Sequence, residues 1–190
     1  MCRAAANKLS AIKRLNRYFS KVTKIQMVKT FVISQFNYCP LVWHFCGDGS
    51  IHKMEKIQER ALRFVENDYI SEYSEILNTC NESTLYLKRV RIMAQEVYKS
   101  VNGLNPKYVQ ELLVSRNSEY SNRRPLDLYV PGVKQITYGY KSYRYEAPSL
   151  WNSLPLEIRR AENYNLFKKL IKTWSGPSCR CSYCNRVEEH

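Results

Sequence analysis

The sequence predicts a mainly α-helical protein, in which an N-terminal antiparallel helical bundle is followed by a smaller α+β region with a short β-hairpin. Two observations lead to this fold class. Apolar residues recur at three- and four-residue spacing through most of the first 115 residues, and this is the period of an amphipathic helix. Two later segments, residues 126–130 and 136–145, are rich in aromatic and β-branched residues and poor in helix formers, a composition that favours strands.

Three helices are predicted in the first 65 residues. Residues 7–18 carry an apolar stripe on one side and lysine and arginine around the other. Ser20 can cap a second helix, and Pro40 must kink or end it. After a Gly-Asp-Gly break, Ser50 can cap the third helix. Such short connections predict an antiparallel bundle.

The rest of the chain is predicted to be helical except around the hairpin, which turns at Pro131 and Gly132. Helices are expected at residues 72–80, 85–101, 106–114, 147–154, 155–161 and 166–174. The chain becomes polar from residue 115 to 124, which marks the best internal boundary. We therefore expect a helical part at residues 1–115, a small α+β region at 116–175 and a cysteine-rich tail at 176–190.

The chain is strongly basic, and its charge is unevenly placed. Thirty Lys and Arg residues against seventeen Asp and Glu give a net charge of +13, which favours a polyanionic partner. Cations along a helix can follow a phosphate backbone while an aromatic ring stacks on a base or sugar. The alternative is a solvated helix face, but such a face would mix both signs, and no acidic residue occurs before Asp48. The candidate nucleic-acid-binding residues are Lys8, Lys13, Arg14, Arg17, Tyr18, Lys21, Lys24 and Lys29.

The acidic residues do not support a catalytic metal centre. Two-metal polymerases and nucleases need carboxylates that hold ions about 4 Å apart, yet the three aspartates, Asp48, Asp68 and Asp127, are scattered along the chain. The sequence contains no Gly-rich phosphate-binding loop and no nucleophile-elbow motif. We therefore expect that this chain is not an enzyme by itself and requires no cofactor.

The cysteines fall into two groups. The first lies in the tail, where Cys179, Cys181, Cys184 and His190 offer the ligand set of a closed tetrahedral zinc site. Only Cys181 and Cys184 have the usual spacing, so a site completed by ligands from outside this chain and a flexible tail without metal are the alternatives. The second group lies in or beside apolar stretches and is expected to be buried: Cys2, Cys39, Cys46 and Cys80.

No stretch approaches the roughly 18 uninterrupted apolar residues of a membrane span. The first residues also lack the apolar segment and the cleavage site of a signal peptide. We therefore expect an intracellular protein, nuclear or cytoplasmic, that is neither secreted nor membrane-spanning.

Three strings resemble a known family when they are taken together and in order. They are Ser-Gln-Phe-Asn-Tyr-Cys-Pro-Leu-Val-Trp at residues 34–43, Ile-Gln-Glu-Arg-Ala-Leu-Arg at 57–63, and Pro-Ser-Leu-Trp-Asn-Ser-Leu-Pro at 148–155, ahead of Phe-Lys-Lys at 167–169. The chain is similar to the region downstream of the polymerase palm in reverse transcriptases of non-long-terminal-repeat retrotransposons, especially the jockey-like lineages. The resemblance covers nearly the whole chain.

The resemblance implies a division of roles. Residues up to about 65 would form the thumb-like helical part that grips the template-primer duplex, and the rest would be a C-terminal extension, which often ends in a cysteine-rich knuckle. The catalytic aspartates of the family belong to a palm that would lie upstream of Met1, so polymerisation would belong to the full-length RNA-directed DNA polymerase. The expected partners are an RNA or DNA template-primer and that palm. The alternative is a non-catalytic helical protein-interaction module, left as a relic of a truncated element.

Overall fold

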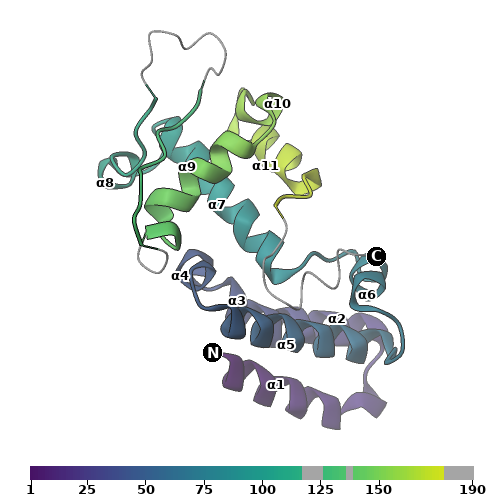
Figure 1. Ribbon diagram of the computed structural model, residues 1–190. Coiled ribbons are helices and arrows are strands. Elements are labelled where there is room, and N and C mark those ends of the chain that lie inside the picture. The colour runs from purple at the N-terminus through teal and green to yellow at the C-terminus, as the bar shows by residue number, and fades with distance from the viewer. Residues whose placement is uncertain (117–125, 136–138, 178–190) are drawn as a thin grey trace. The chain divides into compact units, whose positions relative to one another are not determined.

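The computed structural model describes residues 1–116, 126–135 and 139–177 (Figure 1). These residues are mainly helical, which confirms the coarse fold class. They pack as two compact units: unit 1 contains Met1–Arg89, and unit 2 is Val90–Gly176. The predicted boundary near residue 115 therefore differs from the division of the structure, which falls inside a long helix at residues 85–101. The sequence could not place this division, because that helix supplies buried side chains to the cores of both units.

Unit 1 is a succession of helical segments. In chain order these are α1 (Cys2–Arg14), η1 (Asn16–Tyr18), α2 (Lys21–Met27), η2 (Val28–Ile33), α3 (Ser34–Asn37), α4 (Pro40–His44), α5 (Asp48–Glu66) and α6 (Tyr73–Thr79). η1 is a 3-10 turn, and η2 has π-helical geometry. Ser20 caps α2 as predicted, because its Oγ accepts a hydrogen bond from the Thr23 N–H at 3.3 Å. Pro40 is the first residue of α4, whereas α5 begins at Asp48, before its predicted cap Ser50.

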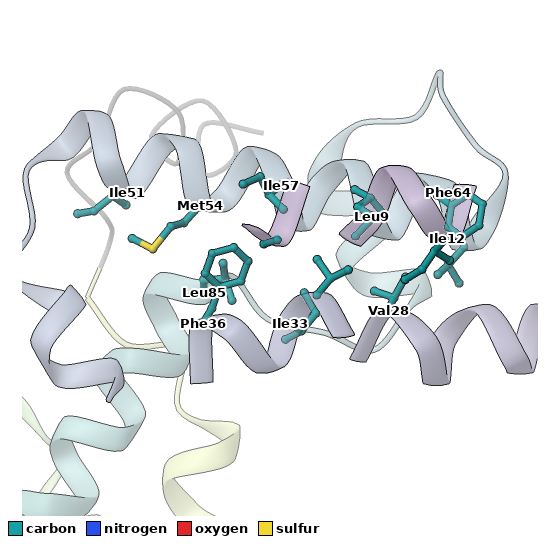
Figure 2. Close-up of a cluster of buried hydrophobic side chains, with 14 residues drawn as sticks. Leu9, Ile12, Val28, Ile33, Phe36, Ile51, Met54, Ile57, Phe64 and Leu85 are labelled. Carbon is teal, nitrogen blue, oxygen red and sulfur yellow. The ribbon is translucent and has the colours of Figure 1, made fainter. Parts of the chain in front are cut away.

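One apolar core holds α1, α2, η2, α3 and α5 together, and Trp43 of α4 packs against it. Along the bundle, α1 and α5 run in the same direction, and the α2–α3 segment runs back in the opposite direction (Figure 1). Leu9 and Ile12 of α1 lie beside Phe64 of α5 in this core (Figure 2). Burying one large apolar side chain contributes about 1.5–3 kcal/mol, whereas helices as short as α3 are not stable alone in water. The shared core, rather than helix propensity, therefore stabilises the bundle.

Two buried polar residues of α5 fix the start of α7 (Leu85–Val101). The Glu55 carboxylate accepts hydrogen bonds from the N–H groups of Leu85 and Tyr86 at 3.2 and 2.7 Å, and from the Tyr73 hydroxyl at 3.1 Å. The Gln58 amide donates to the carbonyl oxygen just before α7, that of residue 83, at 2.9 Å. Burial raises the pKa of Glu55, although these hydrogen bonds and the nearby Arg89 guanidinium act in the opposite direction.

Unit 2 packs around the C-terminal part of α7. Its other helices are α8 (Lys107–Gln110), α9 (Tyr143–Ser153), α10 (Leu156–Arg159) and α11 (Tyr164–Thr173). The Tyr98 ring of α7 stacks on Phe167 of α11 with the centroids 4.3 Å apart, and Trp151 of α9 stacks on the same phenyl ring at 6.2 Å. The helix predicted to reach residue 114 ends at Gln110.

The predicted β-hairpin is wrong for the residues that the structure describes. Residues 143–145 form the first turn of α9, and Leu128 makes an isolated antiparallel bridge to Ser115 instead of pairing with the second predicted strand. The physical reason is that side chains of α9 take the place of a partner strand. Asn152 accepts from the Leu128 N–H and donates to the Leu128 carbonyl, both at 2.8 Å, while Trp151 Nε1 donates to the Leu126 carbonyl at 2.8 Å. Residues 136–138 of the predicted hairpin lie outside the described residues.

Candidate nucleic-acid interface

Half of the predicted nucleic-acid-binding residues are exposed on α1 and η1 without a charged partner. The Tyr18 side chain is 81% exposed, and Lys8, Arg14 and Arg17 are exposed as well. These three cations form no ion pair within residues 1–116, 126–135 and 139–177. They are therefore available to an anionic partner.

The three candidate lysines on α2 and η2 are engaged within unit 1. Lys21 Nζ lies 2.6 Å from a Glu66 oxygen, and Lys29 Nζ lies 2.9 Å from a Glu82 oxygen. The Lys24 ammonium lies 5.1 Å from the centroid of the Phe64 ring, within reach of a cation–π interaction. These lysines link α2 and η2 to α5 and to the turn before α7. They are thus weaker candidates for phosphate contact than the cations of α1.

Lys13 is half-buried and lies on the side of α1 that faces α5. Burial lowers the pKa of Lys13, and the positive charge of Arg60 on α5 lowers it further. Lys13 and Arg60 belong to two helices that share one core, although they are far apart in sequence.

The sequence analysis left the cations of α5 out of the candidate site. Lys53, Lys56 and Arg60 are exposed and form no ion pair with any described residue. Their three- and four-residue spacing places them on one helix face, which was visible in the sequence. That their helix packs against α1 was not visible in the sequence, because it depends on the core that the two helices share. We call the predicted cations of α1 and η1, together with these three cations of α5, the N-terminal basic cluster: Lys8, Lys13, Arg14, Arg17, Lys53, Lys56 and Arg60.

The acidic residues near this cluster are occupied elsewhere. Glu59 accepts from Arg63 at 2.7 Å, four residues along the same helix. Glu66 pairs with Lys21, and its other oxygen accepts from the Cys80 thiol at 3.4 Å. The remaining carboxylate in the middle of α5, Glu55, is buried. These three carboxylates therefore do not neutralise the N-terminal basic cluster.

The three aspartates do not come together. Asp48 is the first residue of α5, and Asp68 accepts from backbone N–H groups in the turn that follows the same helix. Hydrogen bonds from Ser71 and then Ile70 lower the pKa of Asp68 to about 2. Asp127 belongs to unit 2, where it is buried and accepts from Arg159 at 2.7 Å. Each aspartate thus stabilises local structure.

The predicted zinc ligands, Cys179, Cys181, Cys184 and His190, lie outside the described residues. In residues 1–116, 126–135 and 139–177, no three His, Cys, Asp or Glu side chains are placed to hold a metal ion. Within the same ranges no helix is long and apolar enough to cross a membrane.

The other four cysteines are less buried than predicted. Cys39 is exposed and has a left-handed backbone with φ of 44°, so the prediction of burial is wrong for it, because it stands in the turn between α3 and α4. Cys2, Cys46 and Cys80 are half-buried. Burial raises the pKa of Cys80 to about 11, and the adjacent Glu66 carboxylate acts in the same direction.

Comparisons of this chain with protein-family models, with curated proteins and with solved structures give no match.

Proposed function

We propose that unit 1 binds nucleic acid through the N-terminal basic cluster. The observation that carries this proposal is a set of cations on α1, η1 and α5 that have no ion pair in the described part of the chain, while Glu55, Glu59 and Glu66 of α5 have other partners. Such a surface attracts polyanions and gains affinity from the release of condensed counterions. The exposed Tyr18 adds a ring that can stack on a base.

The resemblance to retrotransposon reverse transcriptases supports a more specific form of this proposal. Its first string covers α3 and all but the last residue of α4, its second lies in α5, and its third lies mostly in α9. On this basis we propose that unit 1 corresponds to a thumb-like part that grips a template-primer duplex. The palm that would carry the catalytic aspartates would then be a partner upstream of this chain, and the chain itself would not polymerise nucleotides.

The test is the salt dependence of binding to a fluorescently labelled DNA duplex and to an RNA–DNA hybrid. Four to six phosphate contacts would give a slope of log affinity against log salt of about −4 to −5. The joint variant Lys8→Gln, Arg14→Gln, Arg17→Gln should reduce this slope by up to about 2.7. Tyr18→Ala should weaken binding by roughly 1–3 kcal/mol and leave the slope unchanged.

The matched control is the joint variant Lys168→Gln, Lys169→Gln, Lys172→Gln on α11, which removes the same charge from exposed positions in unit 2. It should change the slope less than the α1 variant. Binding that ignores ionic strength, or an equal effect of the two variants, contradicts the proposal.

A second candidate function, a protein-interaction module, has its own support. Unit 1 exposes several large apolar side chains, of which Ile70 is 97%, Tyr38 75% and Val42 68% exposed. Apolar surface of this kind is typical of protein–protein contacts when it is contiguous. The family resemblance implies that this partner is the palm of the full-length polymerase. Under this proposal, Val42→Ser should weaken association with the purified palm of a related full-length polymerase, and nucleic-acid affinity should not depend on Arg14 or Arg17.

A further inference from the structure

We infer that α1 enters the major groove of B-form DNA and that Arg3 and Asn7, on its first two turns, contact the edges of the bases there. This inference rests on the proposed function and deepens it, because it names the groove, the helix that enters it and the two residues that read the sequence. Neither Arg3 nor Asn7 belongs to the N-terminal basic cluster.

α1 packs against the rest of unit 1 through one face. The buried residues of that face are Ala5, Leu9 and Ile12, and they belong to the apolar core that α1 shares with α5. Figure 1 shows α1 at the outer edge of the bundle, with α5 and the α2–α3 segment on the same side of it. A regular helix held by a buried core gives the rigid support that a binding surface needs.

The face of α1 opposite the core is exposed and polar. At 3.6 residues per turn, the positions opposite the buried face are occupied by four exposed residues: Arg3, Asn7, Ser10 and Arg14. The small residues Ala4 and Ala11 lie next to this stripe and are exposed as well, so the helix backbone can approach a partner closely. A helix with side chains is about 10–12 Å across, and the major groove of B-form DNA is about 12 Å wide.

The side chains on the first two turns match the chemistry of base edges. The Arg3 guanidinium can donate two hydrogen bonds to O6 and N7 of guanine, and the Asn7 amide can accept from N6 and donate to N7 of adenine. Neither side chain has a hydrogen bond or an ion pair within residues 1–116, 126–135 and 139–177. The two residues are one helical turn apart, a spacing at which helices in the major groove contact neighbouring base pairs.

The charge of α1 favours contact with the phosphates that border the groove. The helix contains no acidic residue. Lys8 lies on its flank, Arg14 at its C-terminal end and Arg17 in η1, and all three are exposed. Phosphate contacts fix the orientation of a protein on the duplex, whereas base contacts supply specificity. Because the major groove of A-form RNA is too deep and narrow for side chains to read, this arrangement favours DNA over double-stranded RNA.

The experiment begins with a selection from a pool of DNA duplexes that have fixed ends and a randomised central segment. The wild type should enrich duplexes that carry a guanine and an adenine at neighbouring base pairs. It should bind an enriched duplex about 5- to 150-fold more tightly than a duplex in which the adenine position is replaced. Methylation of N7 of the guanine, which lies in the major groove, should weaken binding to the enriched duplex.

Two substitutions on α1 separate base contact from phosphate contact. Asn7→Ala should remove the preference at the adenine position and leave the salt slope unchanged, because the amide carries no charge. Lys8→Ala should weaken binding to both duplexes alike and reduce the slope by about 0.9. The matched control is Gln26→Ala, which removes another exposed amide, on α2, and should change neither quantity. Circular dichroism confirms that each variant keeps the helical fold.

The outcomes distinguish this inference from the proposed function. Salt-dependent binding without sequence enrichment, or a preference that Asn7→Ala leaves intact, overturns the major-groove contact while the proposed function stands. Binding to double-stranded RNA as tight as binding to the enriched DNA duplex has the same consequence. Wild-type protein without any salt-dependent binding overturns both.

Discussion

Glu55 joins three helices of unit 1 through one carboxylate. It lies on the buried side of α5 and accepts hydrogen bonds from the first N–H groups of α7 and from Tyr73 of α6. The N-terminus of a helix carries a partial positive charge, and the buried Arg89 adds a full one. The helix is therefore capped by a residue thirty positions earlier in the chain.

We expect Glu55→Ala to lower the free energy of unfolding by about 3 kcal/mol, because it leaves buried donors unpaired and removes the counter-charge of Arg89. Glu55→Gln keeps one acceptor oxygen and should lose less. Urea unfolding followed by circular dichroism measures both changes. A loss below about 1 kcal/mol for Glu55→Ala contradicts the assigned role.

The free energy of unfolding should depend on pH because the Glu55 carboxyl titrates differently in the folded and unfolded states. Because burial raises the pKa of Glu55 above its unfolded value, the folded state binds this proton more tightly than the unfolded state does. The stabilisation from that proton is complete below about pH 4 and is lost as the pH rises through the folded pKa. Relative to Glu55→Gln, the wild type should therefore lose stability across this window. If the wild type instead gains stability relative to Glu55→Gln as the pH rises, the pKa of Glu55 is lowered rather than raised on folding.

The sequence could not show which of the basic residues in the candidate site have acidic partners in the folded chain. Lys21 and Lys29 have the same appearance in the sequence as Arg14, yet their acidic partners stand in α5 and in the turn before α7. Arg60 joins the N-terminal basic cluster only because α1 and α5 share a core. By contrast, the basic character of the first segment follows directly from the absence of acids before Asp48.

Among the elements, helices with a long apolar stripe were predictable and the segment around Leu128 was not. The structure gives α7 the predicted bounds, Leu85–Val101, because its apolar positions recur with helical period over many turns. Residues 126–128 have strand-like composition, but their backbone groups are bonded to Asn152 and Trp151 of α9. Pairing of a backbone with side chains leaves no periodic pattern in either segment.

The Asn152 contacts give a second stability prediction. Asn152→Ala should lower the free energy of unfolding by about 2 kcal/mol, because the N–H and carbonyl of the buried Leu128 both lose their partner. Thermal unfolding measures the change. Ser153→Ala is the matched control on the same helix: its side chain is bonded only to Leu150 of its own turn, so the change should stay within about 0.5 kcal/mol. Equal effects of the two substitutions would contradict a stabilising role for the Asn152 hydrogen bonds to Leu128.

For the whole molecule, we expect no primer extension on an RNA template with magnesium. The aspartates of the chain are distributed over the start of α5, the turn after α5 and the Asp127–Arg159 pair of unit 2, so they do not provide the two close carboxylates that a two-metal centre needs. The decisive contrary result is extension above a no-protein control that disappears when an aspartate of this chain is replaced.

The tail provides a separate prediction: Cys179, Cys181, Cys184 and His190 bind one zinc ion. Thiolate ligands must lose their protons, so binding should release protons and become weaker at low pH. Metal analysis of protein purified without a chelator measures zinc content. Protein without zinc, or an unchanged content in Cys181→Ser, favours the alternative of a tail without metal.

The position of Glu55 and Gln58 has a consequence for the order in which the chain becomes structured during synthesis. A nascent chain that has emerged only as far as α5 contains all the basic helices, but it carries a buried carboxylate and a buried amide whose partners are not yet made. Leu85, which belongs to the same core, is missing as well. The bundle therefore cannot reach its final state until the first turn of α7 has left the ribosome. A length of chain defined by the basic helices alone would be an incomplete folding unit.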